Sequence, residues 1–351
     1  METIDVAVAT EMKGAHLGEF FSSLAETPEV AHVAIADVSG ESLAEAREIL
    51  GDKLTGEYRS IAKLLAKTQA KLLLVSMEPR NTPAVIDAGL EAGCHVLTEK
   101  PACVRVEDFA PLVRKAQSKH LQVMLALANR PHAPVQEARR IVNQGLLGKL
   151  YGVNMHLVAD QARLKRPDYR DSWRGSKARA GGGHLAWLGI HWLDMAMYVT
   201  GLRVERVAGF YDVVGGQPID VEDSAAVSLK FSDGVLGTML SGFYLDKAYK
   251  ENVKRYHSHM QIWGEDGWLR LSTFEEEPLE WYSSRAADKP VVQTFEYPKG
   301  LRSYQPFVRA AVRFSAGLAA PPITSEEGLH VLQTIFAFYK AADAGAAQEV
   351  R

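Results

Sequence analysis

The fold is decided by His95-Val96-Leu97-Thr98-Glu99-Lys100-Pro101, a short apolar run that ends in two charged residues and a proline. Such a run is typical of the carboxyl end of a buried parallel strand, the edge at which open α/β sheets bind ligands. A lysine there can direct its ammonium at a substrate hydroxyl. Pro101 restrains the residue before it and so fixes the direction of Lys100. From these residues alone, a solvated lysine at a strand end is the stronger interpretation.

The first part of the chain alternates short apolar runs with amphipathic stretches, from Ile4 to about Ala128. This βαβ series predicts a parallel sheet with helices on both faces, which binds nucleotides where the strand order reverses. The expected strands are 4–9, 32–37, 71–75, 95–97 and 122–126, and the expected helices lie near 16–26, 42–50, 60–67, 82–92 and 106–119.

The first strand-to-helix loop should carry phosphate-binding glycines, but residues 9–16 read Ala-Thr-Glu-Met-Lys-Gly-Ala-His. Of a G-x-G-x-x-G pattern only Gly14 remains, so the backbone cannot approach a pyrophosphate as closely. Glu11 adds an unfavourable negative charge unless it points away. Thr10 and Lys13 partly compensate through a hydroxyl hydrogen bond and a positive charge. Whether this loop binds a dinucleotide is therefore an open question.

Asp37 ends the second expected strand about 20 residues after the loop, where an acid bonds the ribose 2′-hydroxyl and repels a 2′-phosphate. This position favours NAD over NADP. The alternative is a helix cap or a turn acid before Ser39-Gly40.

The pattern changes after an expected helix at 133–143, because strands then follow one another. Hairpin signals at 232–235 and 264–267 predict a largely antiparallel sheet. One face of such an open sheet must be covered, by the first domain's helices or by another subunit. The expected strands are 149–158, 203–214, 224–232, 235–244, 258–264, 267–272, 279–283 and 291–297.

Two domains are thus predicted, a Rossmann dinucleotide-binding domain at 1–128 and an α+β domain with a large, mostly antiparallel open sheet at 129–351. The tail at 304–344 returns to helical periodicity and could pack back on the first domain. A length of 351 residues fits two units, since single cores stop growing at roughly 250 to 300 residues.

A glycine-rich stretch begins at Gly181-Gly182-Gly183 and continues as an expected helix up to Gly201. Four residues on it are spaced by three and four and should share one helix face: His184, Trp187, His191 and Asp194. The two histidines are two turns apart, roughly 10 Å, which is too far for one shared metal ion. We interpret His191 as a base and Asp194 as an acid that orients it or raises its pKa. The alternative is a satisfied core histidine.

A basic loop precedes the glycines, with Tyr169 and Trp173 among its cations. It could hold an anionic group of substrate or cofactor at the cleft, or be a solvated basic loop. Its cations are Arg163, Lys165, Arg166, Arg170, Arg174, Lys177 and Arg179.

Composition excludes several classes of protein. The formal net charge of −3 provides no field for nucleic acid or a membrane surface, and no stretch reaches the ~18 apolar residues of a membrane span. Cys94 and Cys103 have no metal-ligand or redox spacing, so we expect reduced core thiols. The chain enters its first strand without a basic leader, and we expect a cytoplasmic protein.

In this order the motifs resemble those of the Gfo/Idh/MocA oxidoreductase family, over nearly the whole length. The resemblance is carried by the strand end 93–101, the triple-glycine helix with Gly189-x-His191-x-x-Asp194, and the antiparallel sheet after it. Supporting matches are Asn129-Arg130, the turn from Gly145 to Gly148 leading into 150–153, and Trp173-Arg174.

The resemblance implies a nicotinamide-binding Rossmann domain, a substrate domain whose sheet often forms an oligomer interface, and sugars, polyols or their derivatives as substrates. Lys100 takes the family's catalytic lysine position and His191 its catalytic histidine position. One departure is Trp187, which stands where the family usually has an aspartate one turn before the histidine. Its indole could pack on the apolar face of a sugar ring or only fill the domain interface.

The leading hypothesis is an NAD-dependent oxidoreductase that acts on a secondary hydroxyl of a carbohydrate-like substrate. The expected cofactor-binding residues are Thr10, Lys13, Gly14, Asp37, Ser76, Pro79, Glu99, Lys100, Trp173 and Arg174. The expected substrate residues are Lys100, Trp187, His191, Asp194, Arg163 and Tyr169, with Lys100 and His191 catalytic and no metal.

Two alternatives stay open. The first is a redox-neutral glycosidase, lyase or epimerase in which bound NAD oxidises the sugar transiently, and the altered residue 187 supports it. The second is a non-catalytic sensor or regulatory protein, which the eroded glycine loop supports. In each case we expect a homo-oligomer, a dimer or tetramer formed through the antiparallel sheet, and no nucleic-acid or membrane partner.

Overall fold

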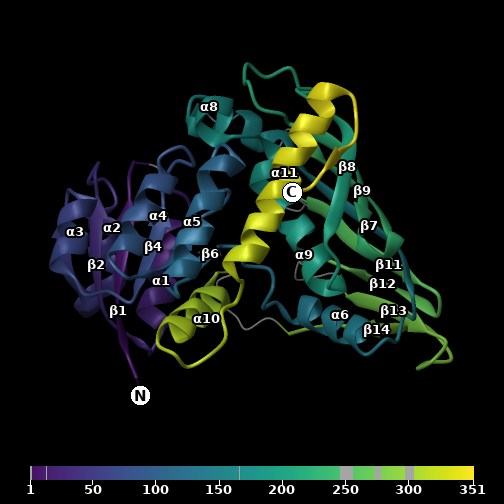
Figure 1. Ribbon diagram of the computed structural model, residues 1–351, viewed down its shortest axis with the longest axis horizontal. Helices are drawn as coiled ribbons and strands as arrows, with labels where there is room; N and C mark the ends of the chain where they lie inside the picture. Colours follow the sequence, from purple (N-terminus) through teal and green to yellow (C-terminus); the bar gives the residue numbers. More distant parts are fainter. Residues whose placement is uncertain (1, 13, 166, 246–255, 273–277, 297–303) are drawn as a thin grey trace. The chain divides into compact units, whose positions relative to one another are not determined.

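The computed structural model describes residues 2–12, 14–165, 167–245, 256–272, 278–296 and 304–351, without the side chains at 163, 165, 167 and 168. It divides into two compact units (Figure 1). Unit 1 comprises residues 1–128, 178–180 and 299–329, and unit 2 comprises residues 129–177, 181–298 and 330–351.

Unit 1 is built on a six-stranded parallel sheet with the order β3-β2-β1-β4-β5-β6, so the strand order reverses between β1 and β4. The predicted parallel sheet is confirmed. Its strands are β1 (Ile4–Thr10), β2 (Val30–Asp37), β3 (Leu54–Tyr58), β4 (Leu72–Ser76), β5 (His95–Thr98) and β6 (Val123–Leu125). Every residue of β4 is buried, because the central strands of a sheet covered on both faces meet no water.

Strand β3 was not among the expected strands, and the physical reason is its place at the sheet edge. Its sequence, Leu-Thr-Gly-Glu-Tyr, alternates partly buried with exposed residues and contains no apolar run. An edge strand pairs on one side only, so its sequence need not be continuously hydrophobic.

Among the described residues, six α-helices belong wholly to unit 1. Five follow its strands in the chain: α1 (Leu17–Glu26), α2 (Leu43–Leu50), α3 (Ile61–Lys67), α4 (Thr82–Glu91) and α5 (Val106–Ser118). The sixth, α10 (Gln305–Ser315), comes from the distant tail and packs against α1. Arg309 and Arg313 of α10 pair with the buried carboxylate of Glu29, and these ion pairs hold the tail segment to the sheet domain.

Unit 2 is built on a nine-stranded sheet with the order β14-β13-β12-β11-β7-β10-β9-β8-β15. All neighbours are antiparallel except β7 and β10, so the prediction of a mostly antiparallel large sheet is confirmed. Its strands are β7 (Leu150–Asp160), β8 (Val204–Asp212), β9 (Ser224–Phe231), β10 (Leu236–Leu245), β11 (Tyr256–Gly264), β12 (Gly267–Leu271), β13 (Leu279–Ser283), β14 (Val291–Gln293) and β15 (Gln348–Glu349).

Helices lie against one face of this sheet (Figure 1). Helix α6 (Ala133–Asn143) packs on α9 (Ile190–Thr200), and α9 contacts β7. Two one-turn helices, α7 (Pro167–Arg170) and α8 (Lys177–Ala180), lie in the connection between β7 and α9. The last helix, α11 (Ser325–Ala344), starts in unit 1 and continues through unit 2. No helix in the part of the chain that the structure describes is long and apolar enough to cross a membrane.

Candidate active site

The carboxyl edge of the parallel sheet brings together several of the predicted cofactor residues. Strands β1 and β4 end side by side at Thr10 and Ser76. The Thr10 hydroxyl donates to the carbonyl oxygen of Ser76 at 2.8 Å, and the Ser76 hydroxyl donates to the carbonyl oxygen of Ala15 at 2.7 Å. Both hydroxyls therefore brace the first loop against the strand ends.

Gly14 is required by this bracing. A Cβ at residue 14 would lie 2.3 Å from Thr10 Oγ1 and 2.7 Å from the Ser76 carbonyl oxygen, closer than real Cβ atoms come. The loop thus turns tightly from β1 into α1 with one glycine, and the start of α1 lies at the strand ends. A helix start at this edge suits a phosphate group, so these residues fit a dinucleotide despite the missing glycines. Lys13 lies outside the residues that the structure describes.

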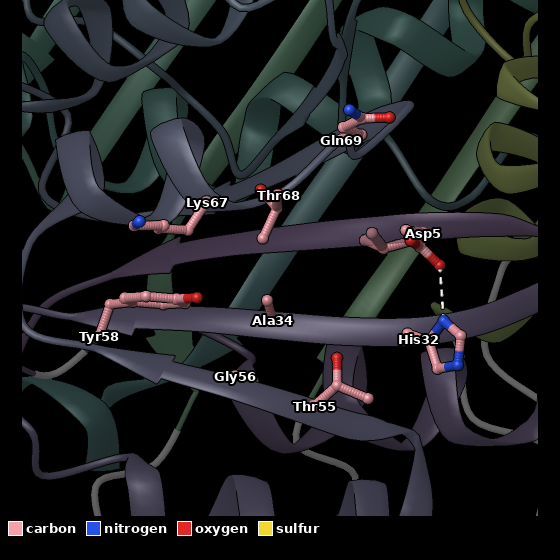
Figure 2. A pocket seen from close by; sticks show the side chains of 10 residues that line it. Asp5, His32, Ala34, Thr55, Gly56, Tyr58, Lys67, Thr68 and Gln69 are labelled. Carbon is pink, nitrogen blue, oxygen red and sulfur yellow. Dashed lines mark hydrogen bonds and ion pairs between the residues drawn. The ribbon is translucent and has the colours of Figure 1, made fainter.

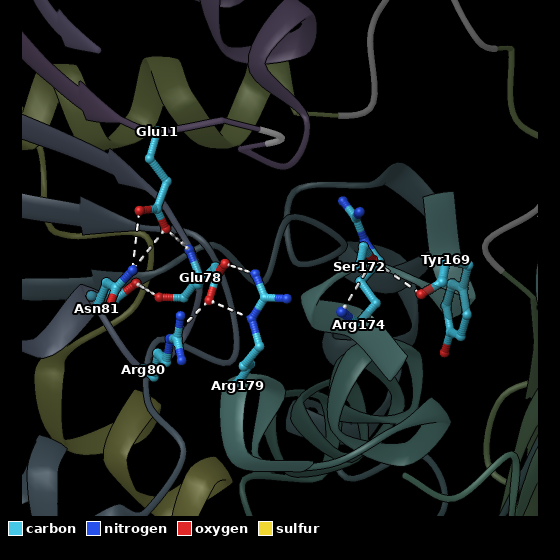
Figure 3. Close-up of polar contacts among 9 residues, drawn as sticks. Glu11, Glu78, Arg80, Asn81, Tyr169, Ser172, Arg174 and Arg179 are labelled. Carbon is cyan, nitrogen blue, oxygen red and sulfur yellow. Dashed lines mark hydrogen bonds and ion pairs between the residues drawn. The ribbon is translucent and has the colours of Figure 1, made fainter. Parts of the chain in front are cut away.

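Glu11 directs its charge at the start of α4 rather than into the first loop (Figure 3). Its Oε1 accepts from the backbone N–H of Glu78 at 2.7 Å, and both its oxygens lie within 3.2 Å of the side-chain nitrogen of Asn81. The predicted Pro79 is buried in the same turn. Negative charge near a helix N-terminus is favourable. The Glu11 carboxylate, which we expected to disfavour a phosphate at the cofactor loop, therefore has partners near the start of α4 instead.

Glu78 forms the centre of an ion-pair cluster that the sequence did not predict (Figure 3). Arg179 donates to both its oxygens, from Nε at 3.0 Å and from Nη2, while Arg80 Nε lies 3.0 Å from Oε2. Arg179 was expected only as part of a basic loop. The hydrogen bond to Glu78 raises the pKa of Arg179, so the guanidinium stays charged.

Asp37 is fully buried, and both its carboxylate oxygens cap the turn into α2. Oδ1 accepts from the N–H and hydroxyl of Ser39 at 2.8 and 2.7 Å, and Oδ2 accepts from those of Ser42 at 2.8 and 2.7 Å. Burial acts to raise the pKa of Asp37, but the bonds from Ser42 and Ser39 outweigh it and lower the pKa. These contacts are those of a turn acid, which the sequence left open as the alternative to a ribose ligand.

Glu99 and Lys100 lie at the end of β5 and are both buried, at 4% and 2% exposure. Lys100 is therefore not the solvated lysine that the strand-end sequence alone favoured. Its Nζ lies 3.5 Å from Glu99 Oε1, and Nδ1 of His16 lies 3.4 Å from Oε2. Burial acts to raise the pKa of Glu99, but His16 and Lys100 outweigh it and hold the pKa below its usual value.

A hollow of about 530 Å³ on unit 1 holds none of the predicted site residues (Figure 2). Asp5 and His32, which pair at 2.9 Å on its wall, lie near the amino ends of β1 and β2. Its other lining residues are Val6, Ala34, Thr55, Gly56, Tyr58, Lys67, Thr68 and Gln69. Because ligands of parallel sheets bind at the carboxyl edge, this hollow is not the candidate site.

In unit 2, the predicted histidine helix starts as a π-helical turn, Leu185–Gly189, before it continues as α9. The expectation that four residues share one α-helical face is therefore wrong, because the π turn has a wider repeat than 3.6 residues. His184 is buried, with Nδ1 at 2.7 Å from the Ser241 hydroxyl and its ring edge-on to Phe243. His191 is partly buried on the first turn of α9.

Asp194 forms a buried ion pair with Arg130, which lies just before α6. Arg130 Nη2 donates to Oδ1 at 2.7 Å and Nε to Oδ2 at 3.0 Å. The motif Asn129-Arg130 was part of the resemblance, but this partner was not predicted. Asp194 thus anchors α9 to the start of α6, and its predicted role toward His191 stays a prediction.

Trp173, Arg174 and Trp187 come together in unit 2. The two indoles meet edge-to-face at 5.2 Å, and the Arg174 guanidinium lies 4.6 Å from the ring of Trp173 and 5.3 Å from that of Trp187. The Ser172 hydroxyl accepts from the N–H of Arg174 and donates to the carbonyl oxygen of Tyr169 (Figure 3). These contacts fix a cation between aromatic faces.

The remaining predicted substrate residues are less informative. Tyr169 is a core residue, 6% exposed and edge-on to Phe243 at 6.0 Å. The side chain of Arg163 lies outside the described part of the structure. No group of three or more metal-ligating side chains that could hold an ion occurs among the residues the structure describes.

Fold and site together define a two-unit protein with a Rossmann sheet in one unit and a large, mostly antiparallel sheet in the other. Residues 12–127 match a family model described as an oxidoreductase family with an NAD-binding Rossmann fold, and residues 135–270 match the GFO/IDH/MocA C-terminal domain. The chain belongs to the GFO/IDH/MocA family, and NAD is its cofactor. The predicted family and cofactor are confirmed.

Individual relatives are distant. The D-glucoside 3-dehydrogenase of Escherichia coli is 25% identical over 74% of this chain and 74% of its own length, and the levoglucosan dehydrogenase of Pseudarthrobacter phenanthrenivorans is 24% identical over 58% and 57%. The chain spans about half the length of the first curated relatives it matches. A solved oxidoreductase domain protein from Kribbella flavida has the same fold, with a TM-score of 0.86, 20% identity and full coverage of both chains.

Proposed function

We propose that this chain is an NAD-dependent dehydrogenase that oxidises a secondary hydroxyl of a sugar, polyol or sugar derivative. Membership of an oxidoreductase family supports the reaction class, and the names of two relatives, which are dehydrogenases of levoglucosan and of D-glucosides, support the substrate class. The observation that carries the proposal is the buried ammonium of Lys100, held beside the carboxylate of Glu99 at the carboxyl edge of the parallel sheet.

The cofactor would be held by residues of this edge and by the aromatic group of unit 2. When bound, NAD accepts a hydride from the carbon that bears the hydroxyl. The loop around Gly14 and the start of α1 suit the pyrophosphate, and Asp37 suits the adenosine ribose and disfavours a 2′-phosphate. The other residues assigned to the cofactor are Thr10, Lys13, Ser76, Pro79, Glu99, Lys100, Trp173 and Arg174.

Lys100 and His191 share the proton chemistry in this proposal. The Lys100 ammonium donates a hydrogen bond to the substrate oxygen and stabilises the negative charge that develops there. The His191 imidazole removes the hydroxyl proton as a general base. Trp187 would pack on the apolar face of the sugar ring, where the family's usual aspartate would bond a hydroxyl.

The experiment is a panel of sugars, polyols and sugar acids incubated with the full chain and NAD, with NADH followed by absorbance. We expect NADH with at least one of them, little with NADP, and a large loss of turnover in Lys100→Met and His191→Asn. Turnover that survives both substitutions would refute the assigned chemistry.

A redox-neutral reaction is the second candidate, and the placement of Trp187 supports it. The indole packs with Trp173 and Arg174 at the position where the family usually has an acid. The carboxylate that would bond a substrate hydroxyl in an ordinary dehydrogenase is therefore replaced by an apolar ring. Product formed by elimination or epimerisation, with stoichiometric NAD co-purified and no net NADH, would favour this reaction over the first.

We also propose that the chain forms a dimer or tetramer through the outer face of the nine-stranded sheet. Leu236 and Trp263 flank Gly152 across β10, β7 and β11 and are 64% and 39% exposed, and Phe210 on β8 is 80% exposed. Exposed apolar residues gathered on one sheet face indicate a protein interface. Light scattering should give a dimer or tetramer that Trp263→Lys dissociates, and a monomeric native chain would contradict the proposal.

A cytoplasmic location is proposed from the thiols. Cys94 and Cys103 are free and buried, and burial raises the pKa of Cys94 to about 11, so both suit a reducing compartment. Cell fractionation of the native protein tests this location.

A further inference from the structure

Glu222 lies just before β9 in unit 2, and its carboxylate is 3% exposed. It accepts hydrogen bonds from the backbone N–H of Gly183 at 2.7 Å, from that of Leu185 at 2.9 Å and from the hydroxyl of Tyr339 at 2.9 Å. Tyr339 comes from α11. Two elements far apart in the sequence thus meet at the start of the π turn through one side chain.

The backbone at residue 222 also shapes this start. Its carbonyl oxygen accepts from the N–H of His184 at 3.0 Å. A Cβ at residue 183 would lie 1.9 Å from this carbonyl oxygen, and a Cβ at residue 182 would lie 2.2 Å from the hydroxyl of Tyr339. Gly182 and Gly183 are therefore required for docking against Glu222 and Tyr339, which gives the triple glycine a structural role.

The carboxylate satisfies N–H groups that a helix start leaves without an intrahelical partner. The N–H of Trp187 then bonds to the carbonyl oxygen of Gly183 at 2.9 Å, so the first helical bond begins on a residue that Glu222 holds. At the other end of the π turn, a Cβ on Gly189 would lie 2.9 Å from Met239 and 3.1 Å from Ser241, both on β10. The register of the turn is thus fixed at both ends from outside the helix.

This register decides where Trp187 and His191 lie relative to each other, because a π turn adds a residue to the α-helical repeat between them. We propose that Glu222 is a positioning residue, whose carboxylate holds the π turn in register and thereby sets the direction in which Trp187 and His191 face the substrate. This inference rests on the proposed function, in which His191 removes the hydroxyl proton.

The test compares Glu222→Gln with a matched control, Asp223→Asn. Asp223 is the adjacent residue, is 1% exposed, and caps a different segment by accepting from the N–H groups of Val214 and Gly215 at 2.9 and 2.8 Å. Both substitutions remove one buried charge from a backbone-capping carboxylate. A purely structural role of Glu222 would make the two variants behave alike.

Two readouts are used. The first is the NMR signal of the Trp187 indole N–H and the titration of His191 in labelled protein without substrate. The second is kcat, KM and the pH dependence of kcat/KM on the substrate found in the panel. We expect Glu222→Gln to shift both NMR signals and to lower kcat on the order of a hundredfold, with a smaller change in KM, since small misplacements of reacting groups have effects of this size. Asp223→Asn should leave both NMR signals and kcat unchanged.

Tyr339→Phe removes one hydrogen-bond donor to Glu222 and keeps the ring, so it should shift the same NMR signals by a smaller amount. It replaces Glu222→Gln in the test if that variant does not fold. Unmoved Trp187 and His191 signals in both variants would overturn the proposal. If the signals move but His191→Asn turns over at the wild-type rate, the positioning role stands and the proposed function fails.

Discussion

One buried glutamate lies near the candidate site residues of each unit, and the two carboxylates are compensated by different means. Glu99, at the end of β5, has the ammonium of Lys100 and the imidazole of His16 beside it. Glu222, at the start of the π turn, accepts from two backbone N–H groups and a tyrosine hydroxyl. The first carboxylate is thus compensated by charge and the second by neutral donors.

The two environments shift the pKa of the two carboxyls in opposite directions. Burial acts to raise the pKa of Glu99, but His16 and Lys100 outweigh it, so the pKa is lowered. For Glu222 burial is also the largest effect, and hydrogen bonds from Gly183, Leu185 and Tyr339 oppose it without overcoming it, so the pKa is raised. A cation beside a buried acid keeps the acid charged, whereas dipoles alone compensate only part of the desolvation.

The largest expected effect is on turnover, and it concerns the cationic partner of Glu99. Lys100→Met should lower kcat by roughly 10²- to 10⁴-fold, because it removes the donor that stabilises charge on the substrate oxygen. The control is Lys53→Met. The Lys53 ammonium donates to the carbonyl oxygens of Leu24, Ala25 and Thr27, which places it in a structural role. That variant should lose stability and keep its kcat, and equal losses of kcat in the two variants would contradict the assignment.

The next effect is on stability, at Asp194, another buried acid whose charge a cation compensates. Arg130→Met should lower the free energy of unfolding of unit 2 by about 3–5 kcal/mol, because it leaves the buried Asp194 carboxylate without its guanidinium. Arg139 is the matched control, since its guanidinium stacks on the same Tyr198 ring, at 3.9 Å against 4.8 Å for Arg130. Arg139→Met should cost about 1 kcal/mol or less. Denaturant unfolding measures both, and similar losses would show that the ring contact matters more than the ion pair.

A smaller effect is expected at Glu11, whose carboxylate accepts hydrogen bonds from the backbone N–H of Glu78 and the side chain of Asn81 in the turn before α4. Glu11→Ala should lower the free energy of unfolding of unit 1 by about 1 kcal/mol, the usual net contribution of a hydrogen bond. Glu48→Ala, at an exposed position of α2, is the control and should change it little. An unchanged free energy of unfolding in Glu11→Ala would show that these hydrogen bonds do not stabilise the turn before α4.

The strand-end half of the site could be predicted from the sequence because it follows from local pattern. The apolar run before Lys100 specified a buried parallel strand, and a parallel strand delivers its last residues to the ligand edge whatever the rest of the chain does. The surroundings of Glu99 beside Lys100 were not predictable, because His16 and its partner Tyr304 come from parts of the chain that are distant in sequence. Strand β3 was not predicted, because an edge strand pairs on one side only and its sequence contains no apolar run.

The helix half was predicted less well, because its geometry is set from a distance. Spacings of three and four predict one face only if every turn is α-helical, and the π turn breaks that condition. The partners that hold it, Ser241, Glu222 and Tyr339, come from other elements of unit 2. No periodicity within residues 181–201 reveals them. The glycines Gly182 and Gly183 before His184 were a visible sign, and their cause is a close approach to Tyr339 and to the Glu222 backbone.

The contrast between the two glutamates is tested most directly by the pH dependence of stability. In the unfolded chain a glutamate has a pKa of roughly 4.3. Because the folded pKa of Glu99 lies lower, its stabilisation is present above that pH and is lost as pH falls through the folded pKa. Because the folded pKa of Glu222 lies higher, the stability it confers falls as pH rises from the unfolded to the folded pKa.

The measurement is native-state hydrogen exchange across the acid range for the wild type, Glu99→Gln and Glu222→Gln, read at amides of β5 and of the π turn. The free-energy difference between wild type and Glu99→Gln should grow as pH rises, whereas that between wild type and Glu222→Gln should shrink. Slopes of the same sign in the two variants would contradict the view that one half of the site is compensated by charge and the other by neutral donors.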